Sequence, residues 1–255
     1  MSITLTGLKD IPMISQGDDL ADIIDNSLPG SNLTLENNDV LVLAQKIVSK
    51  AEGRMVNLAD VTPGERALEL ALRTEKDARL VELILQESKS ILRTRPGTII
   101  VEHKLGFICA NAGIDHSNVA GKGDSSGDMV LLLPKNPDLS ANGIRTKLER
   151  LSGKRIGILI IDSHGRAWRN GTVGISIGMS GIPGVLDERG WKDLFGYTLK
   201  ITIVGVADEL AAAASLLMGQ AAEGIPVIHV RGFPYPLREG SLKEMIRPED
   251  QDLFR

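Results

Sequence analysis

The 255-residue sequence contains a single cysteine, Cys109, and this scarcity excludes a disulfide framework within the chain. It also makes a multi-thiolate metal site very hard to build, because such sites use several cysteines. Cys109 lies within an apolar run, so we interpret it as a small core residue rather than as a nucleophile. No apolar run approaches the roughly 20 residues that a membrane-spanning helix needs, and the first ten residues lack the pattern of a secretory signal. These absences favour the cytoplasm and a protein with no membrane partner.

The sequence also lacks an excess of basic residues. It has 29 lysines and arginines against 33 aspartates and glutamates, which gives a formal net charge of −4. Proteins that bind long phosphate backbones usually carry a basic surplus. We therefore expect no nucleic-acid partner, although a small anion such as a nucleotide can still be bound locally.

Several common active-site signatures are missing as well. The sequence has no G-x-x-x-x-G-K-[ST] phosphate loop and no G-x-G-x-x-G after a predicted strand, so neither a P-loop nor a Rossmann fold is expected. It has no G-x-S-x-G serine elbow. The histidines show no H-E-x-x-H pairing, which disfavours a zinc site.

Short apolar runs separated by glycines and polar turns are what the sequence has in abundance. Seven of them predict strands, several buried on both faces because they are rich in Val and Ile without alternation. They are Val40–Ala44, Thr98–Val101, Phe107–Ala110, Met129–Leu133, Arg155–Ile161, Leu199–Val206 and Val227–Val230.

Three segments between these strands predict helices. One begins at Thr62–Glu65 with Thr62 as the cap, and carries an apolar stripe that includes Leu68 and Leu72. A second covers Asn142–Ser152 before Gly153, and a third runs from about Asp208 to Gly219. The two kinds of element are interleaved without clean alternation, which predicts an α+β (mixed α/β) fold with mixed sheets. The glycine-rich segment Gly121–Gly127 is expected to be a flexible loop or hairpin tip.

Two acidic side chains follow apolar runs and are candidate metal ligands. Asp162, beside Ser163, is expected at the carboxyl end of a strand, and oxygen ligands of this kind suit Mg²⁺ or Mn²⁺. Asp115 follows the run that ends at Ala110. The alternative is that each aspartate caps a turn. If both converge, they can hold one cation, or two cations that flank a phosphate.

Two further segments offer groups for an anion. The strand Val40–Ala44 leads into Gln45, Lys46 and Lys50, whose lysines can contact phosphate oxygens but are more often surface residues. Met218–Ile225 follows the third helix, and its backbone amides can approach a phosphate closely. The alternative for this segment is a plain helix stop and connecting loop.

Taken together, these segments resemble the coenzyme F420-0:L-glutamate ligase family in its stand-alone form. The resemblance rests on an ordered series that spans nearly the whole chain. The series is Gly17-Asp18-Asp19-Leu20, Ile47-Val48-Ser49-Lys50-Ala51-Glu52-Gly53-Arg54, Asn111-Ala112-Gly113-Ile114-Asp115, Ser117-Asn118, Leu131-Leu132-Leu133-Pro134, Asp162-Ser163-His164-Gly165-Arg166, Lys192-Asp193-Leu194-Phe195-Gly196, and Ala207-Asp208-Glu209 leading to Leu217-Met218-Gly219.

The resemblance implies a single ligase domain over residues 1–255, with two intertwined lobes, that forms a homodimer. It implies that Asp115 and Asp162 bind one divalent cation, Mg²⁺ or Mn²⁺, that Ser163 and Gln220 bind a second, and that K⁺ is required. It further implies that GTP is the co-substrate and that F420-0 and L-glutamate are joined. The residues it assigns to GTP are Ile11, Pro12, Met13, Ile14, Gln45, Lys46, Lys50, Asn118, Met218, Gly219, Gln220, Ala221, Ala222, Glu223, Gly224 and Ile225.

The sequence departs from the family pattern at two places. Gln220 is neutral where some members have an acidic residue, which weakens the second metal site. The loop Ala120–Asp128 is longer than usual. We expect catalysis through an acyl-phosphate intermediate, with Asp115, Asp162 and Lys50 as catalytic residues and His116 and His164 as candidate bases. The alternatives are a related amide ligase with a different carboxylate or amino acid, and a catalytically silent GTP- or metal-binding module.

Overall fold

The computed structural model describes residues 2–119 and 128–253. The predicted loop Gly121–Gly127, and with it most of the segment Ala120–Asp128, lies outside the described residues. The strands are β1 (Thr4–Gly7), β2 (Val40–Ala44), β3 (Met55–Asn57), β4 (Ser88–Arg95), β5 (Thr98–His103), β6 (Ile108–Ala110), β7 (Met129–Leu131), β8 (Gly157–Arg166), β9 (Arg169–Ser180), β10 (Leu186–Asp187), β11 (Ile203–Val204) and β12 (Val227–Arg231). The α-helices are α1 (Leu20–Ser27), α2 (Gln45–Ala51), α3 (Glu65–Thr74), α4 (Ala78–Gln86), α5 (Pro137–Ser152), α6 (Val206–Met218) and α7 (Leu242–Met245).

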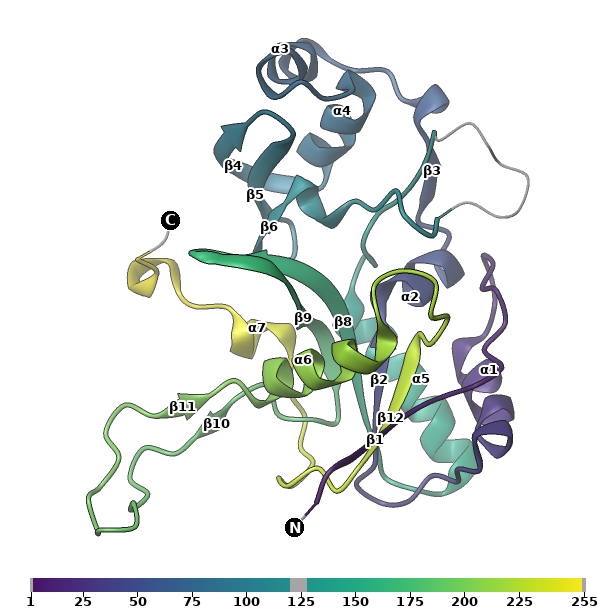
Figure 1. The fold of residues 1–255 in the computed structure, drawn as a ribbon, viewed down its shortest axis with the longest axis vertical. Helices are drawn as coiled ribbons and strands as arrows, with labels where there is room; N and C mark the ends of the chain where they lie inside the picture. The colour runs from purple at the N-terminus through teal and green to yellow at the C-terminus, as the bar shows by residue number, and fades with distance from the viewer. Residues whose placement is uncertain (1, 120–127, 254–255) are drawn as a thin grey trace.

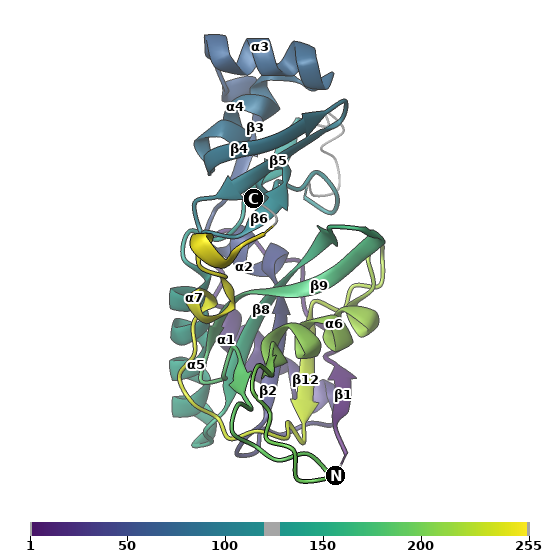
Figure 2. The ribbon, with the colours of Figure 1, turned by 90° about the vertical axis from the view of Figure 1, so that its left-hand side faces the viewer.

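The largest sheet has the strand order β1-β12-β2-β8-β9, in which β2 and β8 are parallel and the other neighbours are antiparallel. Helices α1 and α5 cover one face and α6 covers the other (Figure 2). Alternate residues of β2 therefore enter different cores: Leu41 packs with α1 and α5, and Val42 packs with α6. Burial on both faces explains why this strand is an uninterrupted apolar run.

A second lobe is formed by the chain between α2 and β7 (Figure 1). It contains the sheet β4-β5-β6, the pair β3-β7, and helices α3 and α4. Its core is a separate cluster that includes Val81, Ile84 and Ile99. The interleaved helices and the mixed sheets confirm the α+β prediction. Among the described residues, no helix has the length and apolar character needed to cross a membrane.

A long hairpin arm, residues 186–204, projects from the first lobe (Figure 1). The short strands β10 and β11 pair at its base, and further backbone hydrogen bonds hold it together toward its tip. The prediction of a strand over Leu199–Val206 is confirmed only for Ile203–Val204, which form β11. The residues before β11 are the returning limb of the arm without strand structure, and Val206 begins α6. The segment is apolar, but it packs against no core, so its apolar character did not indicate a buried strand.

Two other predictions also need correction. Helix α3 begins at Glu65 with Gly64 as its N-cap and no side-chain cap, so Thr62 does not have the expected role. Leu68 and Leu72 are exposed, and the buried face of α3 carries Leu70 instead. The helix stops at Thr74 before α4 begins, so one continuous stripe does not run through both helices.

Candidate active site

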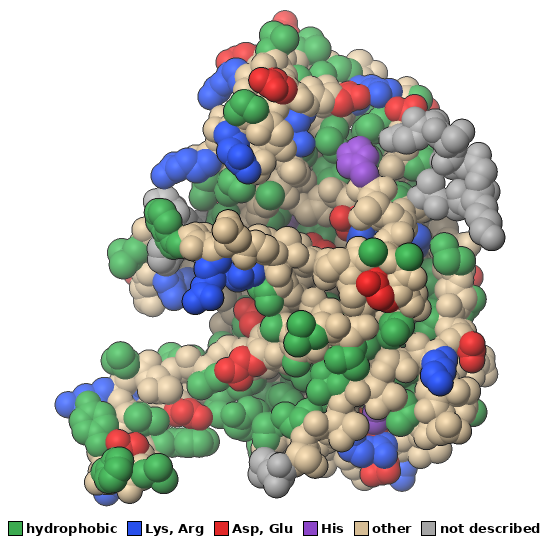
Figure 3. Space-filling model, in the orientation of Figure 1, with side chains coloured by type: hydrophobic (Ala, Val, Ile, Leu, Met, Phe, Trp, Pro, Cys, Tyr) green, Lys and Arg blue, Asp and Glu red, His purple; other side chains and the backbone are tan. Residues whose placement is uncertain are grey.

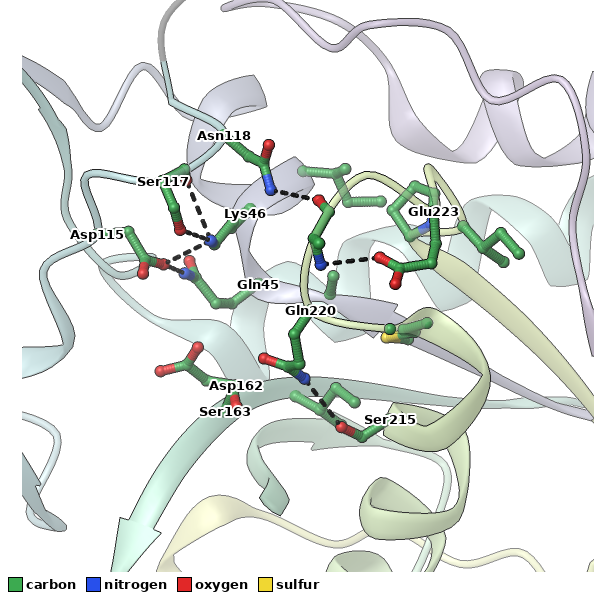
Figure 4. A pocket seen from close by; sticks show the side chains of 18 of the residues that line it. Gln45, Lys46, Asp115, Ser117, Asn118, Asp162, Ser163, Ser215, Gln220 and Glu223 are labelled. Atoms are coloured by element: carbon green, nitrogen blue, oxygen red, sulfur yellow. Dashed lines mark hydrogen bonds and ion pairs between the residues drawn. The ribbon is translucent and has the colours of Figure 1, made fainter. Parts of the chain in front are cut away.

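A cavity of about 630 Å³ lies where α2, β8, the segment before β7 and the loop after α6 meet (Figure 4). This volume suits a small-molecule ligand. Each residue that was predicted to bind GTP or a metal lines this cavity, although these residues come from five separated segments. They are Ile11–Ile14, Gln45, Lys46, Lys50, Asp115, Asn118, Asp162, Ser163 and Met218–Ile225.

The two aspartates meet at this cavity from different lobes. Asp115 follows a short 3₁₀ turn after β6, and its backbone exchanges two hydrogen bonds with Leu131, at 3.0 and 2.9 Å. Asp162 lies in the middle of β8, not at the strand end as predicted, because β8 continues to Arg166 as a hairpin with β9. Burial, and secondly the charge of Asp162, raises the pKa of Asp115 to about 6, against the opposing effect of Lys46. The two carboxylates are therefore near enough to repel each other.

Each carboxylate accepts hydrogen bonds at one oxygen. Asp115 Oδ2 accepts from Gln45 Nε2 at 2.8 Å and lies 3.5 Å from Lys46 Nζ. Asp162 Oδ2 lies 2.9 Å from His164 Nε2. In the part of the chain that the structure describes, no side-chain hydrogen bond reaches Oδ1 of either residue.

The remaining donor atoms fit a hard divalent cation. Ser163 Oγ is buried and has no hydrogen-bond partner among the described residues. Gln220 lies across the cavity from Asp162 in Figure 4, and its Nε2 donates weakly to Ser215 Oγ at 3.4 Å. Within residues 2–119 and 128–253, no three His, Cys, Asp or Glu residues gather as a ligand set. Carboxylate, hydroxyl and amide oxygens are the ligands that Mg²⁺ and Mn²⁺ prefer.

Two lysines from α2 add positive charge on another side of the cavity. Lys50 is 9% exposed, and its Nζ donates to the carbonyl oxygen of Asn118 at 2.7 Å. Burial lowers the pKa of Lys50, and the nearby charge of Lys46 lowers it further. Lys46 Nζ donates to Ser117 Oγ at 3.0 Å. These ammonium groups can bind an anion, because Lys50 donates to a neutral carbonyl oxygen and Lys46 shares the Asp115 carboxylate with Gln45.

The loop after α6 closes one side of the cavity. Asn118 Nδ2 donates to the carbonyl oxygen of Ala221 at 2.9 Å, which ties this loop to the segment that carries Asp115. The Glu223 carboxylate accepts from the Ala221 amide at 2.8 Å. That amide is therefore already engaged, and Glu223 must move before a phosphate can contact it.

The candidate bases differ in position. His164 lines the cavity and is buried, whereas His116 is exposed and is absent from the cavity lining. Two hydroxyl residues that line the cavity, Ser117 and Ser215, were not predicted to act there. Ser49 was noted among the polar residues after β2, but its contact with Gln45 could have been predicted from their i, i+4 spacing only if α2 had been predicted as a helix.

Comparisons with known proteins identify a family for this chain. Residues 9–232 match the sequence profile of the family described as F420-0:γ-glutamyl ligase. A protein of Methanococcus maripaludis (strain C6), named coenzyme F420:L-glutamate ligase, is 45% identical over all of this chain and 98% of its own. Proteins of the same name from Methanothermobacter thermautotrophicus and Archaeoglobus fulgidus are 43% and 42% identical, over all of this chain and 100% and 97% of theirs. On this full-length similarity, the chain belongs to the F420-0:γ-glutamyl ligase family.

Proposed function

We propose that the protein joins L-glutamate to coenzyme F420-0 in F420 biosynthesis, using GTP and divalent cations and releasing GDP and phosphate. The observation that carries the proposal is the convergence of Asp115 and Asp162 on one cavity that also receives Lys46 and Lys50. Two carboxylates beside two ammonium groups can bind a metal-complexed triphosphate next to an acceptor carboxylate. The identity of the two substrates is inferred from membership of the F420-0:γ-glutamyl ligase family.

The chemistry must activate a carboxylate, because an amine does not displace oxygen from an ionised carboxyl group. An oxygen of the F420-0 carboxylate attacks the γ-phosphorus of GTP, and GDP leaves. The resulting acyl phosphate is attacked at carbon by the amino nitrogen of glutamate, and inorganic phosphate leaves with the bonding electron pair. The nitrogen must lose a proton to a base or to water before the neutral amide is complete.

The residues of this chain have distinct parts in that reaction. Lys50 and Lys46 bind and orient the phosphates, while Asn118 holds the loop after α6 against them. Asp115 and Asp162 would hold one divalent cation, and Ser163 and Gln220 a second. When bound, such cations offset the negative charge that gathers on the phosphate and carboxylate oxygens. The K⁺ requirement stays a prediction from the resemblance alone.

The experiment is a ligation assay with purified protein, F420-0, L-glutamate, GTP and Mn²⁺, read by mass spectrometry. We expect a glutamyl increment on F420-0 with GTP, and none when ATP replaces GTP. Asp162→Asn is expected to remain folded and to abolish the increment, since it removes a charged ligand. Undiminished ligation by Asp162→Asn would refute the assigned role of this carboxylate.

Two alternatives are separated by the same assay. A related amide ligase would give an increment only with a different carboxylate or amino acid. A silent binding module would bind GTP and Mn²⁺ yet release no GDP with any acceptor. Both the ligase and the silent module would bind a cation at the neighbouring carboxylates, so release of GDP with F420-0 and L-glutamate is the outcome that separates them.

We also propose that the protein is a homodimer that uses the arm of residues 186–204 as an interface. The arm exposes large apolar side chains toward its tip, and hydrophobic side chains cover its surface in Figure 3. The most exposed are Leu194 at 97% and Phe195 at 94%. A patch of this kind on a projecting hairpin is typical of a protein interface, and a second copy of the chain is the partner that the family resemblance predicts.

A further inference from the structure

The two candidate metal-binding carboxylates are held in the same way, although the residues that hold them come from different elements. Gln45 from α2 donates Nε2 to Oδ2 of Asp115, at 2.8 Å. His164 from β8 meets Oδ2 of Asp162 with Nε2, at 2.9 Å. In each carboxylate, Oδ1 remains without a side-chain hydrogen bond among the described residues.

The orientation of Gln45 is fixed from its other end. Its side chain is 1% exposed, and its Oε1 accepts a hydrogen bond from the Ser49 hydroxyl at 2.9 Å. An ionised carboxylate can only accept hydrogen bonds, so the amide nitrogen of Gln45 must face Asp115. With the oxygen facing Ser49, both the nitrogen and the oxygen of the Gln45 amide form hydrogen bonds before any nucleotide is bound.

The orientation of His164 is fixed by packing. Residues 162 and 164 lie two apart on one strand, so their side chains emerge on the same face. The His164 ring packs against Phe107 with centroids 5.3 Å apart, and Phe107 stacks on His103 at 5.2 Å. His164 Nδ1 is buried and has no partner among the described residues, so the ring gains no alternative hydrogen bond by turning over.

We infer that Gln45 and His164 are positioning residues: each holds Oδ2 of one aspartate so that Oδ1 of Asp115 and Oδ1 of Asp162 are presented to the same divalent cation. This inference rests on the proposed metal-dependent function. It assigns the Gln45 side chain a role other than the nucleotide contact that the family resemblance implies.

The test measures Mn²⁺ affinity of the full-length, nucleotide-free protein by electron paramagnetic resonance, with no turnover required. Gln45→Met and His164→Phe keep side-chain volume and remove the hydrogen bond to the aspartate. Loss of such an outer partner typically weakens metal binding by about 10- to 100-fold, and we expect that loss for each variant. Gln86→Met is the matched control, because Gln86 Nε2 also donates to a carboxylate, Glu82 Oε1 at 3.0 Å, but lies on α4 outside the cavity lining, and this variant should bind Mn²⁺ like the wild type.

A second measurement separates positioning from general stability. In Asp162→Asn, adding His164→Phe should weaken Mn²⁺ binding no further, because the carboxylate that His164 orients is gone. If the role is purely structural, Gln45→Met and His164→Phe will lower the Tm in EDTA without altering Mn²⁺ affinity. If His164 acts independently of Asp162, the double variant will bind Mn²⁺ more weakly than Asp162→Asn alone. Either result overturns the inference. If Asp162→Asn alone binds Mn²⁺ as tightly as the wild type, the metal site of the proposed function fails as well.

Discussion

At the scale of single residues, the site gathers groups whose folded environment opposes their charged state. Asp115 is the clearest case, because burial and the neighbouring Asp162 raise its pKa to about 6. A raised carboxyl pKa means that the folded protein binds this proton more tightly than the unfolded chain does. Ionisation of Asp115 therefore costs no folding stability below pH 3.8. The loss of stability grows between pH 3.8 and about 6 and is complete above that range.

We therefore expect Asp115→Asn to stabilise the metal-free protein at pH 7.5 by about 1–3 kcal/mol, since it removes the ionisation that the fold resists. The gain should shrink toward zero near pH 4, where the wild-type carboxyl is protonated. Thermal unfolding in EDTA at the two pH values measures both. The same variant should lose Mn²⁺ binding. A variant that is less stable than the wild type at pH 7.5 would show that Lys46 and Gln45 fully compensate the charge.

At the scale of elements, the sequence predicts best where a segment meets one environment along its whole length. Strand β2 was predicted at its observed bounds, and the ends of α5 and α6 at Gly153 and Gly219 were also predicted. Helix α2 was missed because seven residues contain too few turns to show a period, and nearly all of its side chains are buried.

Strand β8 shows a second limit of sequence reasoning. Its apolar half, through Ile161, was predicted, but the strand was expected to end at Asp162, whereas it continues to Arg166. That continuation pairs with β9, and pairing between distant residues is not visible in local composition. The convergence of the candidate site residues on one cavity was nevertheless predicted, because an ordered series of motifs carries more information than any one segment.

The loop after α6 depends on the backbone at Gly219, which has φ 68° and ψ −172°. This region is essentially restricted to glycine, and a Cβ at this position would lie 2.1 Å from Glu223 Cδ. We expect Gly219→Ala to displace Glu223 and the Ala221 amide, and to raise the KM for GTP at least several-fold.

Gly143→Ala in α5 is the control for this prediction. A Cβ there meets open space, so that variant should be stabilised by about 0.5–1 kcal/mol with an unchanged KM. An unchanged KM in Gly219→Ala would exclude this loop from nucleotide binding.

The buried residue Asp39 links two inner strands of the main sheet, β2 and β12, at one end of their pairing. Its Oδ2 lies 2.8 Å from both His229 Nε2 and an Arg231 nitrogen, which joins the start of β2 to β12. Burial would raise the pKa of Asp39, but the hydrogen bonds from His229 and Arg231 outweigh it and lower the pKa to about 2. A lowered carboxyl pKa contributes stability that is present above pH 3.8 and is lost as the pH falls through about 2.

Asp39→Asn is therefore expected to lower the free energy of unfolding at pH 7 by about 2 kcal/mol, because it removes the charged acceptor that His229 and Arg231 share and leaves Arg231 paired with Glu36 alone. The difference from the wild type should narrow as the pH drops below 3.8. Denaturant titrations at a series of pH values measure this difference in the free energy of unfolding. An effect that is independent of pH down to 2.5 would contradict the electrostatic explanation.

At the scale of the whole molecule, two lobes with separate cores meet at the cavity, and the arm of residues 186–204 extends away from it. The exposed side chains at the tip of the arm give no stability to an isolated chain. We expect Leu194→Asp combined with Phe195→Asp to convert a dimer into a monomer, because buried charges at an interface are costly. Light scattering after size exclusion should then give 27.4 kDa instead of twice that mass.

The control for the arm is Leu72→Asp, since Leu72 is 84% exposed on α3 in the other lobe. It should leave the mass of the particle unchanged. If the wild-type protein has the mass of a single chain, or if the arm variant remains dimeric, residues 186–204 are not the proposed interface.

The central claim is that Asp115 and Asp162, brought from different lobes, jointly bind a divalent cation beside a guanine nucleotide. The most direct measurement is a crystal structure of the protein with Mn²⁺ and a non-hydrolysable GTP analogue, with the cation located by anomalous scattering. The account predicts an anomalous peak in contact with Oδ1 of both aspartates. A peak that touches neither carboxylate, with nucleotide bound in the cavity, would contradict it.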